Sequence, residues 1–375
     1  MLHSVFAVAH FSRLLCPEAA LIDSMLREEM KKIKYLHVGV ATVFFKPLLD
    51  VIDEEFDRDE HLFILSESIS TEALRGEKNV IVFNPNSLGA IYYYFLILFY
   101  LCFSKRAFFH GLFDLRLLVL LCVAPFWEGK MYWLAWGADL YDRYYESRTV
   151  RARVTKFFRA LVIRRVKHIV TYLRGDYRRA LEWFGCDADY HECLMYPSNT
   201  YKELGERKRV ENCLKILVGN SADPLNGHVE IFDMIAGRLP DNYKIYAPLS
   251  YGDERSKTKV VIEGERRFGD RFIVLDRLMS SPEYARFLGS MDVILFNHPI
   301  QQAMGNTITA LGLGKTVYLR EGVSQWELFC DLGITVLPVD GVDCVRVIDC
   351  SLNEEIVRSY FSMSNLVGQL RLLYC

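Results

Sequence analysis

The sequence predicts an α/β protein made of two Rossmann-like domains that face each other across a cleft. Its 375 residues exceed what a single hydrophobic core usually takes and suit two domains. From residue 33 onward, short β-branched and aromatic runs alternate with longer helical patterns, which predicts βαβ units and parallel sheets. A polar stretch with a glycine, at 202–212, separates two sets of such runs.

The predicted strands form two groups of about six, which is the content of two Rossmann-like sheets. The first group lies at 33–41, 61–65, 80–83, 107–110, 132–136 and 168–172. The second group lies at 214–218, 243–247, 272–275, 293–296, 316–319 and 334–337.

The domain limits follow from these groups. Residues 1–29 precede the first strand and are interpreted as an N-terminal extension, with Met30 as an alternative start. We expect a first domain at 30–205 and a second at 206–375, whose last helix is able to pack back on the first.

Composition excludes several classes of protein. The formal net charge of −2 argues against a nucleic-acid partner. The ten cysteines form no C-x-x-C pair and no cluster with histidine at zinc spacing, so we expect no metal site, no resident cofactor and a reducing compartment. The apolar segment 88–103 is shorter than the roughly 20 residues of a membrane span. Neither a P-loop nor a dinucleotide-binding glycine motif is present.

Polar loops follow the predicted strands of the second domain, at the edge where parallel sheets bind ligands. The first carries Gly219, Asn220 and Ser221, and a later one leads through Gly305 into a helix whose free N–H groups suit a diphosphate. An ordinary turn and a plain capped helix are the alternative interpretations. The full set of predicted donor-binding residues is Gly219, Asn220, Ser221, Ser250, Tyr251, Leu278, Gln301, Gln302, Gly305, Asn306, Thr307, Arg320 and Glu321.

Short segments of both halves resemble glycosyltransferase family 56 in order and approximate spacing. They are His110-Gly111-Leu112-Phe113, Trp136-Gly137-Ala138-Asp139-Leu140-Tyr141, Arg174-Gly175-Asp176, Gly219-Asn220-Ser221, Pro248-Leu249-Ser250-Tyr251-Gly252, Gln301-Gln302 to Gly305, and Leu319-Arg320-Glu321 with Trp326. The resemblance implies a GT-B fold and transfer of a sugar like N-acetylfucosamine, from a dTDP or UDP donor to a polyprenyl-diphosphate-linked saccharide. It further implies synthesis of a surface polysaccharide of the enterobacterial common antigen type, at the cytoplasmic side of the bacterial inner membrane.

The first domain is expected to hold the acceptor and to touch the membrane. Residues 147–167 contain eight cations and no acidic residue, interleaved with apolar side chains, which is typical of a helix at an anionic surface. A solvated basic helix is the alternative, and the aromatic segments 92–103 and 117–127 equally suit core helices. The predicted acceptor and membrane residues are Trp136, Tyr141, Arg148, Arg151, Lys156 and Arg159.

Two residues after first-domain strands are candidates for catalysis. If transfer inverts the anomeric centre, a general base must take the acceptor proton. We favour Asp139, with His110 as base or substrate ligand, whereas Asp176 suits a helix cap. A nucleotide-sugar epimerase of the same fold and a non-catalytic membrane-associated scaffold remain alternative functions.

Overall fold

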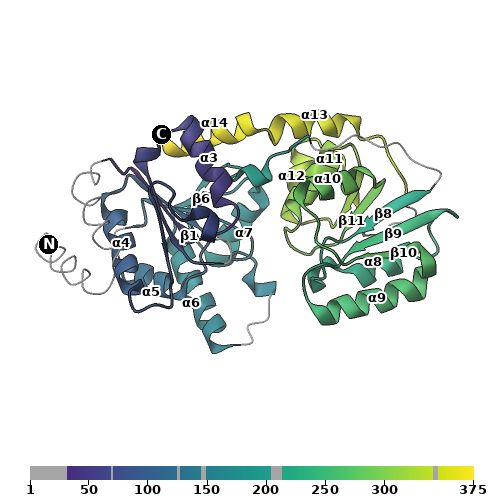
Figure 1. The fold of residues 1–375 in the computed structure, drawn as a ribbon, viewed down its shortest axis with the longest axis horizontal. Coiled ribbons are helices and arrows are strands. Elements are labelled where there is room, and N and C mark those ends of the chain that lie inside the picture. The colour runs from purple at the N-terminus through teal and green to yellow at the C-terminus, as the bar shows by residue number, and fades with distance from the viewer. Residues whose placement is uncertain (1–31, 69–70, 125–126, 145–148, 204–212, 341–344) are drawn as a thin grey trace, which may run out of the picture. The chain divides into compact units, whose positions relative to one another are not determined.

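A computed structural model describes residues 32–68, 71–124, 127–144, 149–203, 213–340 and 345–375 (Figure 1). The expected N-terminal extension and most of the polar stretch between the domains lie outside this part of the chain. The chain forms two compact units, each with its own parallel sheet. The first unit contains residues up to Tyr172, Asp176–Tyr196 and Leu370–Cys375, and the second contains Leu173–Gly175 and Pro197–Gln369.

The sheet of the first unit has seven parallel strands in the order β3-β2-β1-β4-β5-β6-β7. Its central strands are buried on both faces, which explains their continuous apolar sequences. The strands are β1 (Tyr35–Val40), β2 (His61–Ser66), β3 (Val80–Phe83), β4 (Arg106–His110), β5 (Met131–Leu134), β6 (His168–Val170) and β7 (Asp189–His191).

Helices cover both faces of this sheet. Figure 1 shows α4, α5 and α6 together on one side and α3 on the other, as right-handed crossovers require. The side chains of Asp114 and Thr149 accept backbone N–H groups at the starts of α5 and α6, and these caps fix where both helices begin. The helices are α3 (Phe45–Glu55), α4 (Ala90–Phe103), α5 (Leu115–Val123), α6 (Val150–Arg165) and α7 (Arg174–Phe184).

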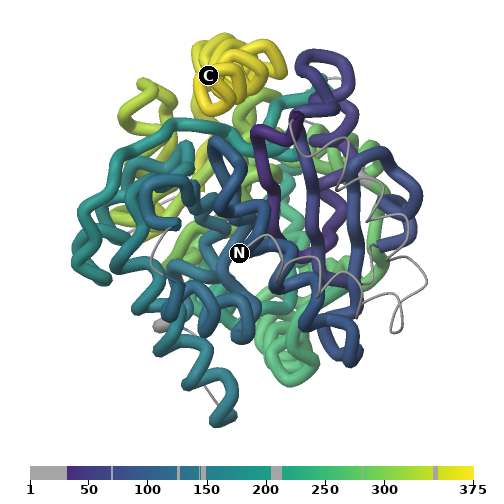
Figure 2. The backbone as a smooth tube through the Cα atoms, turned by 90° about the vertical axis from the view of Figure 1, so that its left-hand side faces the viewer, coloured from purple at the N-terminus to yellow at the C-terminus, as the bar shows by residue number. Residues whose placement is uncertain are grey.

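The end of the chain packs on the first unit. Figure 2 shows the yellow C-terminal residues beside the purple start of the described chain. The Tyr35 hydroxyl donates to the carbonyl of Tyr374, and Arg106 donates to the carbonyl of Leu373. The last residues of α14 (Met363–Tyr374) therefore belong to the core of the first unit.

The second unit repeats the arrangement with six parallel strands in the order β10-β9-β8-β11-β12-β13. The strands are β8 (Leu214–Val218), β9 (Tyr243–Pro248), β10 (Phe272–Leu275), β11 (Val293–Phe296), β12 (Thr316–Leu319) and β13 (Leu337–Pro338). The helices are α8 (His228–Ile235), α9 (Glu254–Phe268), α10 (Ser281–Gly289), α11 (Met304–Gly312), α12 (Ser324–Asp331) and α13 (Ser351–Tyr360). Chain direction across the sheet reverses between β8 and β11, and such a switch point opens a crevice at the carboxyl ends of the strands.

The predicted α/β class with two Rossmann-like sheets is confirmed, and most predicted strands lie within one or two residues of the observed ones. β7 was missed, because Asp189, Tyr190 and His191 form no apolar run and lie at the edge of the sheet. The strand predicted at 334–337 is displaced to Leu337–Pro338. Ile334 instead ends the turn after α12, where its N–H donates to the carbonyl of Phe329.

Among the described residues, no helix has both the length and the apolar character that a membrane crossing requires.

Candidate functional site

The loop after β8, at the switch point of the second sheet, begins with Gly219. Any other residue at this position would force the neighbouring side chains to move. Gly219 follows β8 with φ +68°, and a Cβ there would lie 2.3 Å from Nε2 of His228. The same atom would lie 2.9 Å from Oδ1 of Asn226. The missing side chain thus lets β8 turn sharply and lets two polar side chains pack on its end.

Three polar side chains join the loops after β8 and β11. His298 lies with Nε2 3.1 Å from Oδ1 of Asn220 and 3.0 Å from Oδ1 of Asn226. The orientation of Asn226 is fixed, because its Oδ1 accepts the N–H of Asn220 and its Nδ2 donates to the carbonyl of Asp223. Nε2 of His298 is therefore the protonated nitrogen, and Nδ1 is an acceptor.

The carboxyl edge of the second sheet carries acceptor atoms that have no hydrogen-bond partner within the described part of the chain. They are Nδ1 of His298, Oδ1 of Asn297 and Oε1 of Gln302, all buried. Both amide orientations are set, because Asn297 donates to Glu230 at 2.7 Å and Gln302 donates to Asp223 at 3.4 Å. Buried acceptors are normally hydrogen-bonded, so this edge suits a ligand that supplies hydroxyl or N–H donors.

Helix α11 begins next to these acceptors. Ala303, with φ +56°, turns the chain into the helix, whose first N–H groups have no partner within the helix. Gly305 is exposed and Asn306 half-buried in this first turn, so both remain suited to a diphosphate. Thr307 does not share this position, since it is fully buried and its hydroxyl donates to the carbonyl of Ala303 at 3.0 Å.

The other predicted donor residues lie at varied distances from the switch point. Tyr251 joins the cluster, because its hydroxyl accepts Nδ2 of Asn220 at 3.2 Å. Arg320 lies 3.6 Å from Glu230, which also holds Asn297. Leu278 is 71% exposed after β10, a strand separated from β8 by β9. The remaining positions are buried Ser221, which accepts Nδ2 of Asn226, half-buried Ser250 and Gln301, and exposed Glu321.

In the first unit, His110 belongs to a buried row of hydrogen bonds whose direction can be derived. Trp136 Nε1 can only donate, and it donates to the Tyr196 hydroxyl at 2.9 Å. Tyr196 then donates to Nδ1 of His110 at 2.5 Å, Nε2 of His110 donates to Nδ1 of His37 at 3.0 Å, and His37 donates to His61 at 3.1 Å. Both nitrogens of His110 are thus engaged, and burial lowers its pKa to about 3. This geometry favours a positioning role for His110 over that of a base.

Asp139 is similarly enclosed. It is fully buried, and Oδ2 accepts the Leu112 N–H at 3.1 Å and the Trp133 indole N–H at 2.7 Å. Oδ1 accepts the backbone N–H of Trp136 at 3.0 Å. Burial raises the pKa of Asp139, while the bond from Trp133 opposes that rise. The carboxylate thereby joins the loops after β4 and β5.

The predicted acceptor and membrane residues divide into internal and exposed groups. Arg159 is buried, with Nε donating to the Leu112 carbonyl at 2.6 Å and Nη1 2.9 Å from Asp142, so it supports the fold instead of a surface. Lys156 also faces Asp142, at 3.5 Å, and Arg151 is exposed. The others are half-buried Trp136, buried Tyr141, which donates to Asp176 at 2.5 Å, and Arg148, which lies outside the described residues.

The buried histidines make stability depend on pH. Burial lowers the pKa of His61 and His298 to about 3 and that of His228 to about 4, and the pKa of His37 lies well below its usual range. Below about pH 6.5 the unfolded chain binds protons that the folded chain does not, so the free energy of unfolding falls until the folded histidines titrate.

We expect the free energy of unfolding to be constant above about pH 7 and to fall below pH 6, by up to about 1.4 kcal/mol per pH unit for each such histidine. Denaturant unfolding at pH 7.5, 6.0 and 5.0 measures this slope. His298→Gln should make it shallower, and an unchanged slope would contradict a neutral buried His298.

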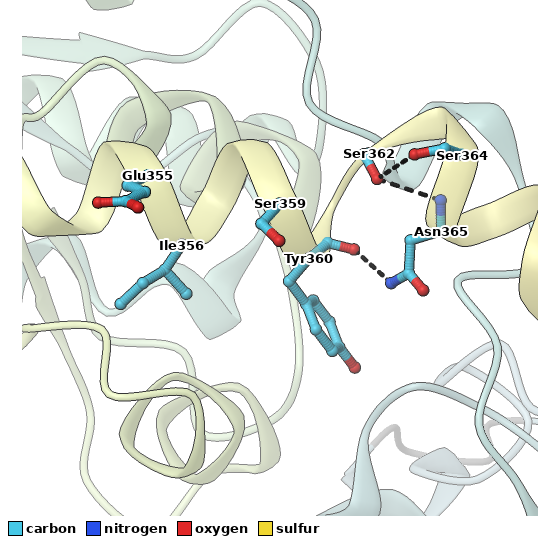
Figure 3. A pocket seen from close by; sticks show the side chains of 7 residues that line it. All are labelled: Glu355, Ile356, Ser359, Tyr360, Ser362, Ser364 and Asn365. Carbon is cyan, nitrogen blue, oxygen red and sulfur yellow. Dashed lines mark hydrogen bonds between the residues drawn. The ribbon is translucent and has the colours of Figure 1, made fainter.

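A shallow hollow lies where α13 meets α14, apart from the predicted site residues. Figure 3 shows its lining, in which Asn365 donates to the Tyr360 carbonyl at 2.6 Å and its N–H donates to Ser362 at 3.1 Å. The lining residues are Glu355, Ile356, Ser359, Tyr360, Ser362, Ser364 and Asn365. Ser362, Asn365 and the Tyr360 carbonyl bond one another, so these groups cap the junction between the two helices.

Known proteins resemble this chain in sequence family and in fold. The family described as 4-alpha-L-fucosyltransferase, glycosyl transferase group 56, matches residues 102–344. HepE of Anabaena, solved with UDP, superposes with a TM-score of 0.64 at 12% identity, covering 91% of this chain and 99% of that one. The lipopolysaccharide outer core galactosyltransferase WaaB gives 0.61 at 11% identity, with 90% and 98% covered. A glycosyltransferase of Rickettsia africae gives 0.54 at 13%, with 91% and 98% covered. The two-sheet architecture is that of GT-B glycosyltransferases, and the chain belongs to glycosyltransferase group 56, the 4-alpha-L-fucosyltransferase family.

Proposed function

We propose that the second unit binds a dTDP- or UDP-linked sugar at the switch point between β8 and β11. The observation that carries this proposal is the set of unpaired acceptors on Asn297, His298 and Gln302 beside the start of α11. Sugar and ribose hydroxyls are donors that would satisfy these acceptors. The diphosphate would lie against the N–H groups of the first turn of α11. HepE, whose structures are described with UDP, with UDP and glucose, and with UDP-glucose, supports a donor of this class.

The proposed reaction is the transfer of a deoxyamino sugar of the N-acetylfucosamine type to a polyprenyl-diphosphate-linked saccharide. The bond between C1 of the sugar and the diphosphate oxygen breaks, and the bonding electron pair leaves with the nucleoside diphosphate. C1 forms a bond to the acceptor oxygen, and the proton of that hydroxyl passes to the departing diphosphate or to solvent water. The positive end of α11, together with Arg320, would stabilise the charge on the departing diphosphate. The 4-fucosyltransferase family supports a deoxysugar donor.

The first unit offers a surface for a lipid-linked acceptor. Helix α4 buries one side but exposes Ile91, Phe95 and Phe103 by 64%, 53% and 65%, which lie on one stripe at helical spacing. Helix α6 exposes Phe157, by 61%, and Arg153, four residues before it, is exposed on the same helix, as is Arg151. Exposed aromatic and cationic side chains of this kind bind the surface of anionic membranes, each cation contributing on the order of 1 kcal/mol. We therefore propose peripheral attachment to the cytoplasmic face of the inner membrane during surface polysaccharide synthesis.

A transfer assay tests the function. Purified full-length protein is incubated with labelled dTDP- and UDP-deoxyamino sugars and with polyprenyl-diphosphate-linked saccharides in vesicles. The proposal predicts label in the lipid fraction that depends on both substrates. Release of free sugar alone, or conversion of the donor without an acceptor, would contradict it.

His298→Ala is expected to weaken dTDP or UDP binding by roughly tenfold, the equivalent of about one hydrogen bond. The reason is the loss of the Nδ1 acceptor and of the link between Asn220 and Asn226. Isothermal titration calorimetry measures the change. Ser362→Ala, in the hollow of Figure 3, is the matched control and should bind like the wild type. Equal affinities for His298→Ala and the wild type would remove His298 from the donor site.

Phe95→Asp together with Ile91→Asp is expected to reduce binding to anionic vesicles at least several-fold, because both exposed side chains leave the apolar stripe. Co-sedimentation with vesicles containing phosphatidylglycerol measures the bound fraction. Ile262→Asp, at a comparably exposed position of the second unit, is the control. The same loss for the control, or none for the α4 variant, would argue against this membrane face.

A further inference from the structure

We propose that β6 and β7 of the first unit hold a divalent transition-metal ion of the zinc class through His168, Asp189 and His191. This proposal departs from the expectation of no metal site, because the spacing of these residues along the chain matches no zinc motif. The site is separate from the proposed donor site, which lies in the second unit.

The strand register brings the three side chains together. His168 pairs with Asp189 across the two parallel strands, and Val170 pairs with His191. Side chains two residues apart on a strand share a face, so Asp189 and His191 both lie on the face of His168. One ligand atom from each residue lies within 4.8 Å of the other two.

The distances suit a tetrahedral ion. Nδ1 of His168 lies 3.1 Å from Nε2 of His191 and 3.6 Å from Oδ2 of Asp189. Two ligands about 2.0–2.1 Å from a tetrahedral zinc ion lie roughly 3.3 Å apart, between these two values. Asp189, whose side chain is 78% exposed, is free to rotate for the third bond, and water would complete the shell. A direct hydrogen bond between the two histidines is the alternative explanation of the first distance.

One aromatic neighbour packs against both histidines and limits the rotation of their rings. The ring of Tyr132 stacks on His168 at 4.4 Å and 11°, and its centroid is 5.0 Å from that of His191. Imidazole and carboxylate ligands favour zinc over magnesium or calcium.

The ion would stabilise the pairing of the edge strand β7 with β6. The chain after β7 leads to Tyr196, which is hydrogen-bonded to Trp136 and His110. The role of the ion is therefore structural, and chelation is expected to leave nucleotide binding by the second unit unchanged.

The test uses the full chain, stripped with a chelator and then supplied with zinc chloride or cobalt chloride. The wild type should retain one zinc ion per chain, and His168→Gln with His191→Gln should bind it more than roughly 100-fold more weakly, since outer-shell changes alone cost about 10–100-fold. Asp187→Asn, a fully exposed neighbour, is the matched control and should bind like the wild type. Circular dichroism of the metal-free proteins checks that the double variant is folded.

The cobalt complex identifies the ligands. Bonds from histidine and carboxylate give visible d–d bands without the near-ultraviolet charge-transfer band of thiolate ligands. Absence of retained metal, equal zinc binding by the folded double variant, or a thiolate band from the cysteines would each overturn the proposal.

Discussion

Gly219→Ala is expected to abolish nucleotide binding by the second unit and to lower its stability by several kcal/mol. The left-handed backbone at φ +68° costs an alanine about 1–2 kcal/mol. In addition, the new Cβ would lie 2.3 Å from His228 and 2.9 Å from Asn226, so both side chains must move, at about 1–3 kcal/mol. Movement of Asn226 breaks its bond to His298 and disassembles the switch-point cluster. Calorimetry with dTDP and UDP, together with denaturant unfolding, measures both effects.

Gly237→Ala separates the two contributions. Gly237 has φ +74° in the same unit, but a Cβ there would meet nothing within 4 Å. Gly237→Ala should lose only the stability that the left-handed backbone costs an alanine, about 1–2 kcal/mol, and should keep full affinity for nucleotide. If Gly219→Ala binds dTDP and UDP as well as Gly237→Ala does, the loop after β8 is not part of the donor site.

Asp139→Ala is expected to destabilise the first unit by about 3 kcal/mol or more and to abolish transfer. The substitution leaves the N–H donors of Leu112, Trp133 and Trp136 without their shared acceptor. The first two donors are buried, and each buried unsatisfied group costs about 1–3 kcal/mol. Nucleotide binding by the second unit should remain. Denaturant unfolding followed by tryptophan fluorescence, with parallel calorimetry, checks the two predictions.

Glu54→Gln, at an exposed position of the first unit, is the control and should leave stability and transfer unchanged. A folded Asp139→Ala protein of wild-type stability that has lost only turnover would show that the carboxylate acts as the base and not as a positioning residue.

The fold could be predicted because most of its strands have a clear signal in the sequence. Central strands buried on both faces need continuous apolar residues, as in β2 and β11, and the turns after them need polar residues and glycine. β7 could not be predicted, because an edge strand needs no continuous apolar run. Its three residues, Asp189, Tyr190 and His191, form a strand through their pairing with β6.

The candidate site was predictable in part, including the backbone of its loops and the side chains of Asn220, Tyr251 and Gln302. Gly219 and the start of α11 stand out because each follows a strand, but His298 was missed since its importance comes from contacts with Asn220 and Asn226 more than 70 residues away. Arg159 misled for the same reason. A cation in a basic helix looks solvated until Asp142 and the Leu112 carbonyl are seen beside it. Such long-range pairing has no local signal in the sequence.

The most direct test of the donor site is a crystal structure of the full chain with dTDP. We expect the diphosphate oxygens within hydrogen-bonding distance of the first N–H groups of α11, around Gly305 and Asn306, and a ligand donor on Nδ1 of His298. Nucleotide bound on the first unit, or elsewhere on the second unit with the acceptors of Asn297, His298 and Gln302 still unpaired, would contradict the account.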